Sequence, residues 1–197
     1  TETGEIYTKA ELQALRNACD KYGLYMYIDG ARMAMALTCE DNDVKFEDFA
    51  QIADMFYIGG TKCGALFGEA VVIINDDLKE DYRFIIKQRG ALLAKVRLMG
   101  VQFNALLRDD TYLELGRHAN KMSKLLREGL AAKGYEFVFK PQTNMAFPMV
   151  EKKLAADLAR NVMFETYPVV TDTHQCIRLV TSWGTTEDEI SEFLKLI

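Results

Sequence analysis

The sequence has few histidines, few and scattered cysteines, no excess of positive charge and no long apolar run. Only His118 and His174 are present, so no metal site is expected. The four cysteines form no CxxC pair, which favours reduced thiols in a cytoplasmic protein over a disulfide framework. The net charge of -5 argues against nucleic acid as a partner. No apolar run reaches the roughly 18 residues that a membrane span needs, so no membrane partner is expected either.

What is present is an ordinary globular composition, with 49% hydrophobic and 27% charged residues in a chain of 197. The first elements predicted from capping and periodicity are a helix at 10–22, a strand at 24–28, a helix at 46–53, and strands at 54–58 and 69–75. Alternating helices and strands are typical of a parallel α/β sheet. The last strand follows too closely for a helical crossover, so we expect it to be antiparallel.

The rest of the chain suggests a small α+β domain, with a boundary near residues 105–112. The predicted elements are a helical stretch at 78–107 interrupted near Gly90 and Gly100, a helix at 110–132, strands at 135–139 and 144–150, a helix near 151–160, a strand at 176–182, and a helix opened by Thr186.

Asp29 and Lys62 stand out, because each sits at or just past the end of a predicted strand. Parallel strands place such residues at one crevice, where ligands of open α/β sheets gather. A lysine in an apolar site should have a partner or a lowered pKa. Together, a lysine that forms a Schiff base and an aspartate that pairs with a pyridinium nitrogen suit pyridoxal 5'-phosphate. An Asp-Gly at a strand end is also compatible with a simple turn.

The segments "YIDGARMAMA" and "ADMFYIGGTKCGALFGEAVVI" resemble the threonine aldolase and β-eliminating lyase family of pyridoxal-phosphate enzymes. "IYTKAELQALRNACDKYGL" and "CIRLVTSWGTTEDEI" are similar to further parts of the family, so the resemblance covers essentially the whole chain. It implies a cytoplasmic lyase that cleaves threonine or allo-threonine to glycine and an aldehyde. It also implies a homodimer or homotetramer.

The resemblance assigns roles to individual residues. Asp29 would pair with the pyridine nitrogen, and Lys62 would carry the Schiff base with Thr61 beside it. Arg97 aligns loosely with an arginine that reaches the cofactor phosphate.

Two further arginines are assigned to the substrate carboxylate, Arg32 and Arg178. A planar guanidinium grips a carboxylate through two parallel hydrogen bonds, which agrees with the role of Arg178. The alternative for Arg178 is a surface salt bridge, which its apolar strand disfavours.

The resemblance also implies a fold. Residues 1–108 would be the later part of the mostly parallel sheet of a large cofactor-binding domain, and residues 109–197 a small C-terminal α+β domain. The family's phosphate-binding turn and ring-stacking histidine are expected upstream of Thr1, so we expect the 197 residues to be inactive alone. The alternatives are β-elimination or transamination, or a non-catalytic α/β binding or assembly module.

Overall fold

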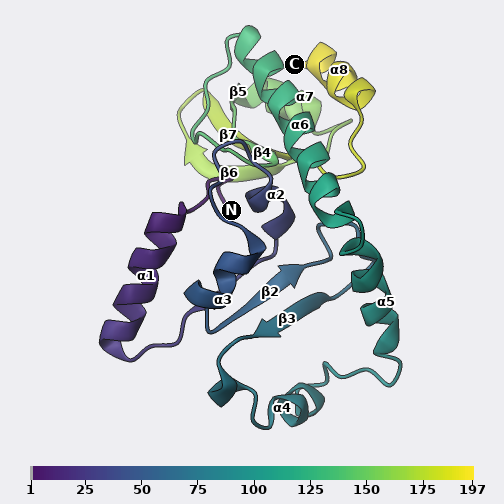
Figure 1. Ribbon diagram of the computed structural model, residues 1–197. Coiled ribbons are helices and arrows are strands. Elements are labelled where there is room, and N and C mark those ends of the chain that lie inside the picture. Colours follow the sequence, from purple (N-terminus) through teal and green to yellow (C-terminus); the bar gives the residue numbers. More distant parts are fainter. Residues whose placement is uncertain (1) are drawn as a thin grey trace.

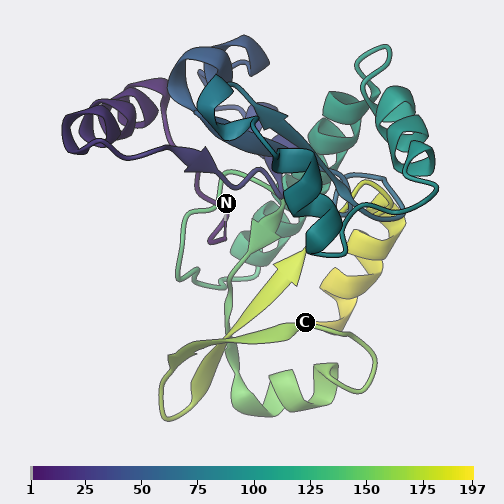
Figure 2. The same cartoon turned by 90° about the horizontal axis from the view of Figure 1, so that it is seen from below.

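The computed structural model describes residues 2–197, and in it two sheets pack near opposite ends of the chain's long helix α6 (Thr111–Ala132). The first sheet and its helices occupy one end of the molecule, and the second sheet with the last two helices occupies the other (Figure 1). Figure 2 shows the same separation from a perpendicular direction, with the blue N-terminal elements on one side and the green to yellow C-terminal elements on the other.

The first sheet has the order β1 (Tyr27–Ile28), β2 (Met55–Gly59), β3 (Glu69–Ile73). Strands β1 and β2 are parallel, and β2 and β3 are antiparallel, so both predicted pairings are confirmed. Strand β1 is shorter than the predicted strand at 24–28. The carboxyl ends of β1 and β2 therefore lie side by side, which is what the candidate site requires.

Helix α1 (Lys9–Tyr22) begins and ends as its sequence predicts. The Thr8 side chain accepts from the Glu11 amide while the Glu11 carboxylate accepts from the Thr8 amide, so two otherwise free donors are satisfied. Gly23 ends the helix at φ 63°, a left-handed conformation that glycine adopts without a Cβ penalty.

Asp54 joins α1 to the first sheet. Its Oδ2 accepts from Arg16 Nη1 at 2.5 Å and from the Met26 amide at 2.7 Å, and its Oδ1 accepts from Asn75 Nδ2 at 2.9 Å. Burial raises the pKa of this carboxyl, but the three donors outweigh burial and lower the pKa to about 2. One charged side chain therefore fixes a helix, the start of β1 and the end of β3.

One face of the first sheet packs against short helices. These are α2 (Met33–Leu37), the 3-10 turn η1 (Phe46–Asp48) and α3 (Phe49–Ile52). Phe56 and Ile58 of β2 point into this core, where the Phe49 and Phe56 rings lie 5.1 Å apart. Tyr27 and Tyr57 point to the other face, where Tyr27 is exposed.

The stretch predicted as helical over 78–107 forms η2 (Asp76–Leu78), α4 (Tyr82–Gln88) and α5 (Arg97–Leu106). The interruption near Gly90 is confirmed, since Gly90 has φ 77°. The predicted interruption at Gly100 is wrong, because Gly100 lies inside α5. Gly100 is at an exposed position of this helix, where glycine costs about 1 kcal/mol relative to alanine.

The second sheet is antiparallel and centred on β7 (His174–Val180). Its other strands are β4 (Met145–Ala146), β5 (Met149–Glu151) and β6 (Glu165–Val170), and the helices beside it are α7 (Lys152–Leu158) and α8 (Glu187–Leu196). The predicted strand at 135–139 is wrong, since it contributes only an isolated bridge between Phe137 and Pro148.

Helix α6 contributes to both hydrophobic cores. Tyr112 and Ala119 lie in the core beneath the first sheet, while Met122, Leu126 and Leu130 lie in the core of the second. A Cβ on Gly116 would come within 2.5 Å of the Ala34 carbonyl oxygen, so glycine lets α2 approach α6 closely. The domain division at residue 108 stays a prediction, and α6 is the element common to both cores.

None of the helices described within residues 2–197 is long and apolar enough to cross a membrane. The same residues hold no group of three or more histidine, cysteine, aspartate or glutamate side chains arranged to bind a metal ion.

Candidate active site

The carboxyl ends of β1 and β2 are held together by backbone contacts between glycines. The Gly59 amide donates to the Gly30 carbonyl at 3.0 Å, just beyond the pairing of Ile28 with Phe56. A Cβ on Gly30 would lie 1.8 Å from the Tyr57 carbonyl oxygen, which only glycine avoids. The site is therefore built on two strand ends that no larger residue could bring so close.

Asp29 projects from the end of β1 with its carboxylate fixed at one oxygen. Its Oδ1 accepts from the Tyr57 hydroxyl and from the Ala31 amide, the latter at 3.0 Å. The hydrogen bond from Tyr57 lowers the pKa of Asp29 most, and the hydrogen bond from the Ala31 amide lowers it further. Burial raises this pKa, whereas the positive charge of Lys62 lowers it. Asp29 is therefore an anion at neutral pH, and it interacts electrostatically with Lys62.

Lys62 sits in a turn that is anchored on both sides. The Gly60 amide donates to Glu69 Oε2 at 2.6 Å, and the Gly60 carbonyl accepts from the Cys63 amide at 2.9 Å. The expectation of an apolar site for Lys62 is wrong, because its side chain is exposed. The turn carries Lys62 past the edge of the sheet and instead directs Cys63, only 1% exposed, into the core.

Buried groups support this turn from below. The Tyr112 hydroxyl donates to the Gly59 carbonyl at 2.8 Å, and burial raises the pKa of Tyr112, so the phenol stays a neutral donor. The Cys63 thiol lies 3.7 Å from the sulfur of Met35, and burial raises its pKa as well. The thiol is therefore an unreactive packing group despite its place next to Lys62.

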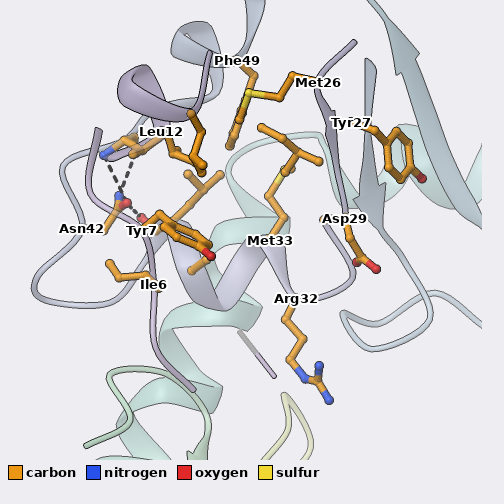
Figure 3. Close-up of a pocket in the computed structure, with 16 residues that line it drawn as sticks. Ile6, Tyr7, Leu12, Met26, Tyr27, Asp29, Arg32, Met33, Asn42 and Phe49 are labelled. Carbon is orange, nitrogen blue, oxygen red and sulfur yellow. Dashed lines mark hydrogen bonds between the residues drawn. The ribbon is translucent and has the colours of Figure 1, made fainter. Parts of the chain in front are cut away.

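Arg32 occupies the N-cap position of α2, where its side chain makes no capping hydrogen bond, and it is half-buried. With Asp29 it lines a cavity of about 340 Å³ whose remaining walls are mostly apolar side chains of the N-terminal segment, α1 and α2. Figure 3 shows Asp29 and Arg32 at the edge of this cavity, with the apolar side chains gathered away from them. The structure therefore brings Asp29 and Arg32 to one cavity, while Lys62 is not among its lining residues.

Arg178 lies in β7 with its guanidinium already engaged. It forms ion pairs with Glu165 of the neighbouring strand and with Glu2, the latter at 3.4 Å. The side chain is only 16% exposed, and within residues 2–197 its Nε has no hydrogen-bond partner. The salt bridge considered as the alternative is present, so the substrate-binding role of Arg178 stays a prediction.

The two remaining candidates are exposed. Arg97 is the first residue of α5, and Thr61 precedes Lys62 in its turn. The Thr61 hydroxyl lies 3.5 Å from the Gly68 carbonyl, at the limit of a hydrogen bond. Both residues are exposed, and their roles in binding the cofactor stay predictions.

Three residues that sequence reasoning missed support the site, namely Tyr57, Glu69 and Tyr112. The role of Tyr57 could have been predicted. Ile28 pairs with Phe56, so the next pair in the same parallel register is Asp29 with Tyr57, on one face of the sheet. Glu69 and Tyr112 act across turns and helix contacts, for which the sequence carries no local signal.

The residues present fit pyridoxal phosphate at two points. Asp29 supplies an anionic oxygen for a protonated ring nitrogen, since Oδ2 has no hydrogen-bond partner within residues 2–197. Lys62 supplies a primary amine, and no ion pair engages it within those residues.

Comparison with known protein families shows to which family the chain belongs. The model of the β-eliminating lyase family matches residues 1–153. The chain belongs to that family. Its members are lyases that use pyridoxal phosphate, as the sequence resemblance implied.

Two curated relatives of this family are similar over almost the whole chain. A low specificity L-threonine aldolase of Pseudomonas aeruginosa is 32% identical over 99% of this chain and 56% of its own length. Another low specificity L-threonine aldolase, from Pseudomonas sp., is 32% identical over 98% of this chain and 55% of its own length. The chain thus spans about half the length of the curated relatives it matches.

Solved structures agree on the fold. A threonine aldolase of Leishmania major matches with a TM-score of 0.96 at 44% identity, over 100% of this chain and 57% of the other. A Thermus thermophilus aspartate aminotransferase matches with a TM-score of 0.69 at 18% identity, over 98% of this chain and 52% of the other, which supports the fold alone. The mixed α/β fold of aspartate-aminotransferase-like enzymes is therefore confirmed.

Proposed function

We propose that the whole protein carrying this chain is a pyridoxal-phosphate-dependent aldolase that cleaves threonine or allo-threonine to glycine and acetaldehyde. The observation that carries the proposal is the pair Asp29 and Lys62 at the ends of adjacent parallel strands, in a chain similar to two threonine aldolases. Because the chain spans about half of those relatives, we propose that the 197 residues are inactive by themselves.

The cofactor, when bound, supplies an aromatic ring that accepts electrons from the substrate's Cα. In the proposed mechanism Asp29 would keep the ring nitrogen protonated through Oδ2, the carboxylate oxygen that accepts no hydrogen bond from residues 2–197. The Lys62 amine would hold the cofactor through its aldehyde group. Thr61, beside Lys62, and Arg97, at the start of α5, would help to hold the cofactor, with Arg97 suited to its phosphate.

The substrate carboxylate is assigned to Arg32 and Arg178. Arg32 lies three residues beyond Asp29 at the edge of the same cavity, which suits an amino acid bound next to the ring. Arg178 has an unsatisfied buried Nε, which a carboxylate would satisfy while replacing one of its glutamate partners. Two guanidinium groups on one carboxylate fix the orientation of the Cα–Cβ bond that is to break.

Lys62→Ala in the whole protein tests the proposal. We expect loss of the visible absorbance band of bound cofactor and a fall in acetaldehyde release by at least about a thousandfold, because no other amine replaces Lys62. Lys79→Ala is the matched control, since Lys79 is exposed and paired with Asp76. Borohydride reduction followed by peptide mass spectrometry locates the modified lysine. Cofactor attached to another lysine, or unchanged acetaldehyde release, would contradict the assignment.

β-Elimination is the second candidate, because the matched family model describes β-eliminating lyases. It requires a proton to be removed from Cα, and the Lys62 amine is the base available for that step. Serine as substrate separates the two reactions, since elimination releases pyruvate and ammonia, whereas aldol cleavage releases glycine and formaldehyde.

We also propose that the whole protein is a homodimer or homotetramer and is located in the cytoplasm. Measuring the molecular mass of the purified whole protein in solution would test the first statement, and locating the protein in cells would test the second.

A further inference from the structure

Tyr57 contacts Asp29 in a way that leaves one carboxylate oxygen free. The Tyr57 hydroxyl and the Ala31 amide both donate to Oδ1, while Oδ2 accepts no hydrogen bond from residues 2–197. Tyr57 reaches Asp29 because β1 and β2 are parallel and in register, so the two side chains are lateral neighbours on one face. The rotation of the carboxylate is therefore fixed by two donors at one oxygen.

We propose that Tyr57 is a positioning residue that fixes Asp29 so that Oδ2 is presented to the ring nitrogen of the cofactor. The inference rests on the proposed function, because it assigns Tyr57 a part in the same site. A carboxylate that accepts these hydrogen bonds is a more stable anion than one without them, so it takes up a proton less readily. The proton between Asp29 and the ring would therefore stay on the ring nitrogen.

The surroundings keep Tyr57 a donor. Burial raises the pKa of Tyr57, and its hydrogen bond to Asp29 and the nearby charge of Glu69 raise it further. The positive charge of Lys62 acts on Asp29, and Tyr27 is a further titratable neighbour of Asp29. A neutral phenol donates to Asp29 throughout the range in which enzymes of this kind are assayed.

Tyr57→Phe in the whole protein with cofactor bound removes the hydroxyl and keeps the ring. Tyr27→Phe is the matched control, since Tyr27 lies 6.2 Å from Tyr57 between ring centroids and makes no hydrogen bond to Asp29. For Tyr57→Phe we expect kcat to fall about tenfold, which corresponds to about 1.4 kcal/mol, with KM nearly unchanged. We expect Tyr27→Phe, which keeps the hydrogen bond from Tyr57 to Asp29, to lower kcat much less than Tyr57→Phe does.

Two further measurements distinguish positioning from a merely structural role. In protein loaded with ¹⁵N-labelled cofactor, the ring nitrogen resonance of Tyr57→Phe should shift toward the unprotonated position, and that of Tyr27→Phe should not. In an Asp29→Asn background, Tyr57→Phe should change kcat by no more than about twofold, because its effect acts through Asp29.

The outcomes separate the two proposals. Wild-type protein that binds no cofactor and releases no aldehyde would defeat both. Active wild-type protein in which Tyr57→Phe matches Tyr27→Phe, or an unshifted ¹⁵N resonance in Tyr57→Phe, would defeat the role of Tyr57 alone. A further tenfold loss in the Asp29→Asn background would also defeat it, since the effect would then not pass through Asp29.

Discussion

Asp54→Asn should destabilise the protein more at neutral pH than in acid. In the folded chain the Asp54 carboxyl is only 15% exposed and Arg16 only 11%, so the pair is poorly screened by solvent. The fall in pKa from 3.8 to about 2 corresponds to about 2 kcal/mol of stability at pH 7. Asparagine keeps the shape but not the charge, so we expect a loss of at least about 2 kcal/mol in the free energy of unfolding.

The sign of the pH dependence follows from the direction of the shift. The folded-state pKa of Asp54 lies below its unfolded value, so the stabilisation is complete above about pH 5 and is lost as the pH falls toward 2. By pH 3 about half of it is gone. The difference between wild type and Asp54→Asn should therefore narrow by about 1 kcal/mol between pH 7 and pH 3.

Urea unfolding followed by circular dichroism at both pH values measures this difference. Asp20→Asn is the control, because Asp20 pairs with the same Arg16 across one helical turn but is 64% exposed. Exposed pairs of that kind contribute about 0.5 kcal/mol. Equal losses of unfolding free energy for Asp54→Asn and Asp20→Asn at pH 7 would refute this role of Asp54, as would a difference between wild type and Asp54→Asn that stays the same at pH 3.

Three further changes test the site and the strands that carry it. Asp29→Asn should lower kcat about a hundredfold, which corresponds to about 3 kcal/mol of transition-state stabilisation, because the charge that holds the ring nitrogen protonated is lost. A near-normal kcat in steady-state kinetics would contradict this. Arg178→Lys should mainly raise KM for threonine, since a point charge cannot make bidentate contacts, and unchanged kinetics would assign Arg178 to its salt bridges alone. Gly59→Ala should lower the free energy of unfolding by about 3 kcal/mol, because the added Cβ would lie 2.4 Å from the Ala31 carbonyl oxygen. A melting temperature equal to that of wild type would refute the close approach of the two strand ends.

Much of the first sheet could be predicted because its signals are local. The capping box at Thr8 and the glycine at Gly23 define α1, and short apolar runs mark β1 and β2. The spacing of Asp29 and Lys62 then follows from the parallel arrangement. The direction of the Lys62 side chain could not be predicted, because it depends on which turn residue packs inward, and Cys63 does.

Strand β6 shows why other parts were missed. It contains Pro168, its side chains are mostly exposed, and its pairing is irregular between Tyr167 and Val170. Such a segment lacks the apolar alternation that marks a strand, and proline is tolerated there because β6 pairs with β7 alone. The hydrogen bond from Tyr57 to Asp29 was likewise missed, because it appears only when two strands are set in register.

Because α6 supplies side chains to both cores, the two sheets share one continuous structural element. Losing the contacts of Met122, Leu126 and Leu130 would expose the C-terminal half of the helix, and its N-terminal half holds Tyr112 against the end of β2. Neither sheet can therefore melt without weakening the other, and heat or denaturant should unfold both in a single cooperative transition. In hydrogen exchange, the amides in the middle of α6 should open only in global unfolding and thus report the stability of the whole chain.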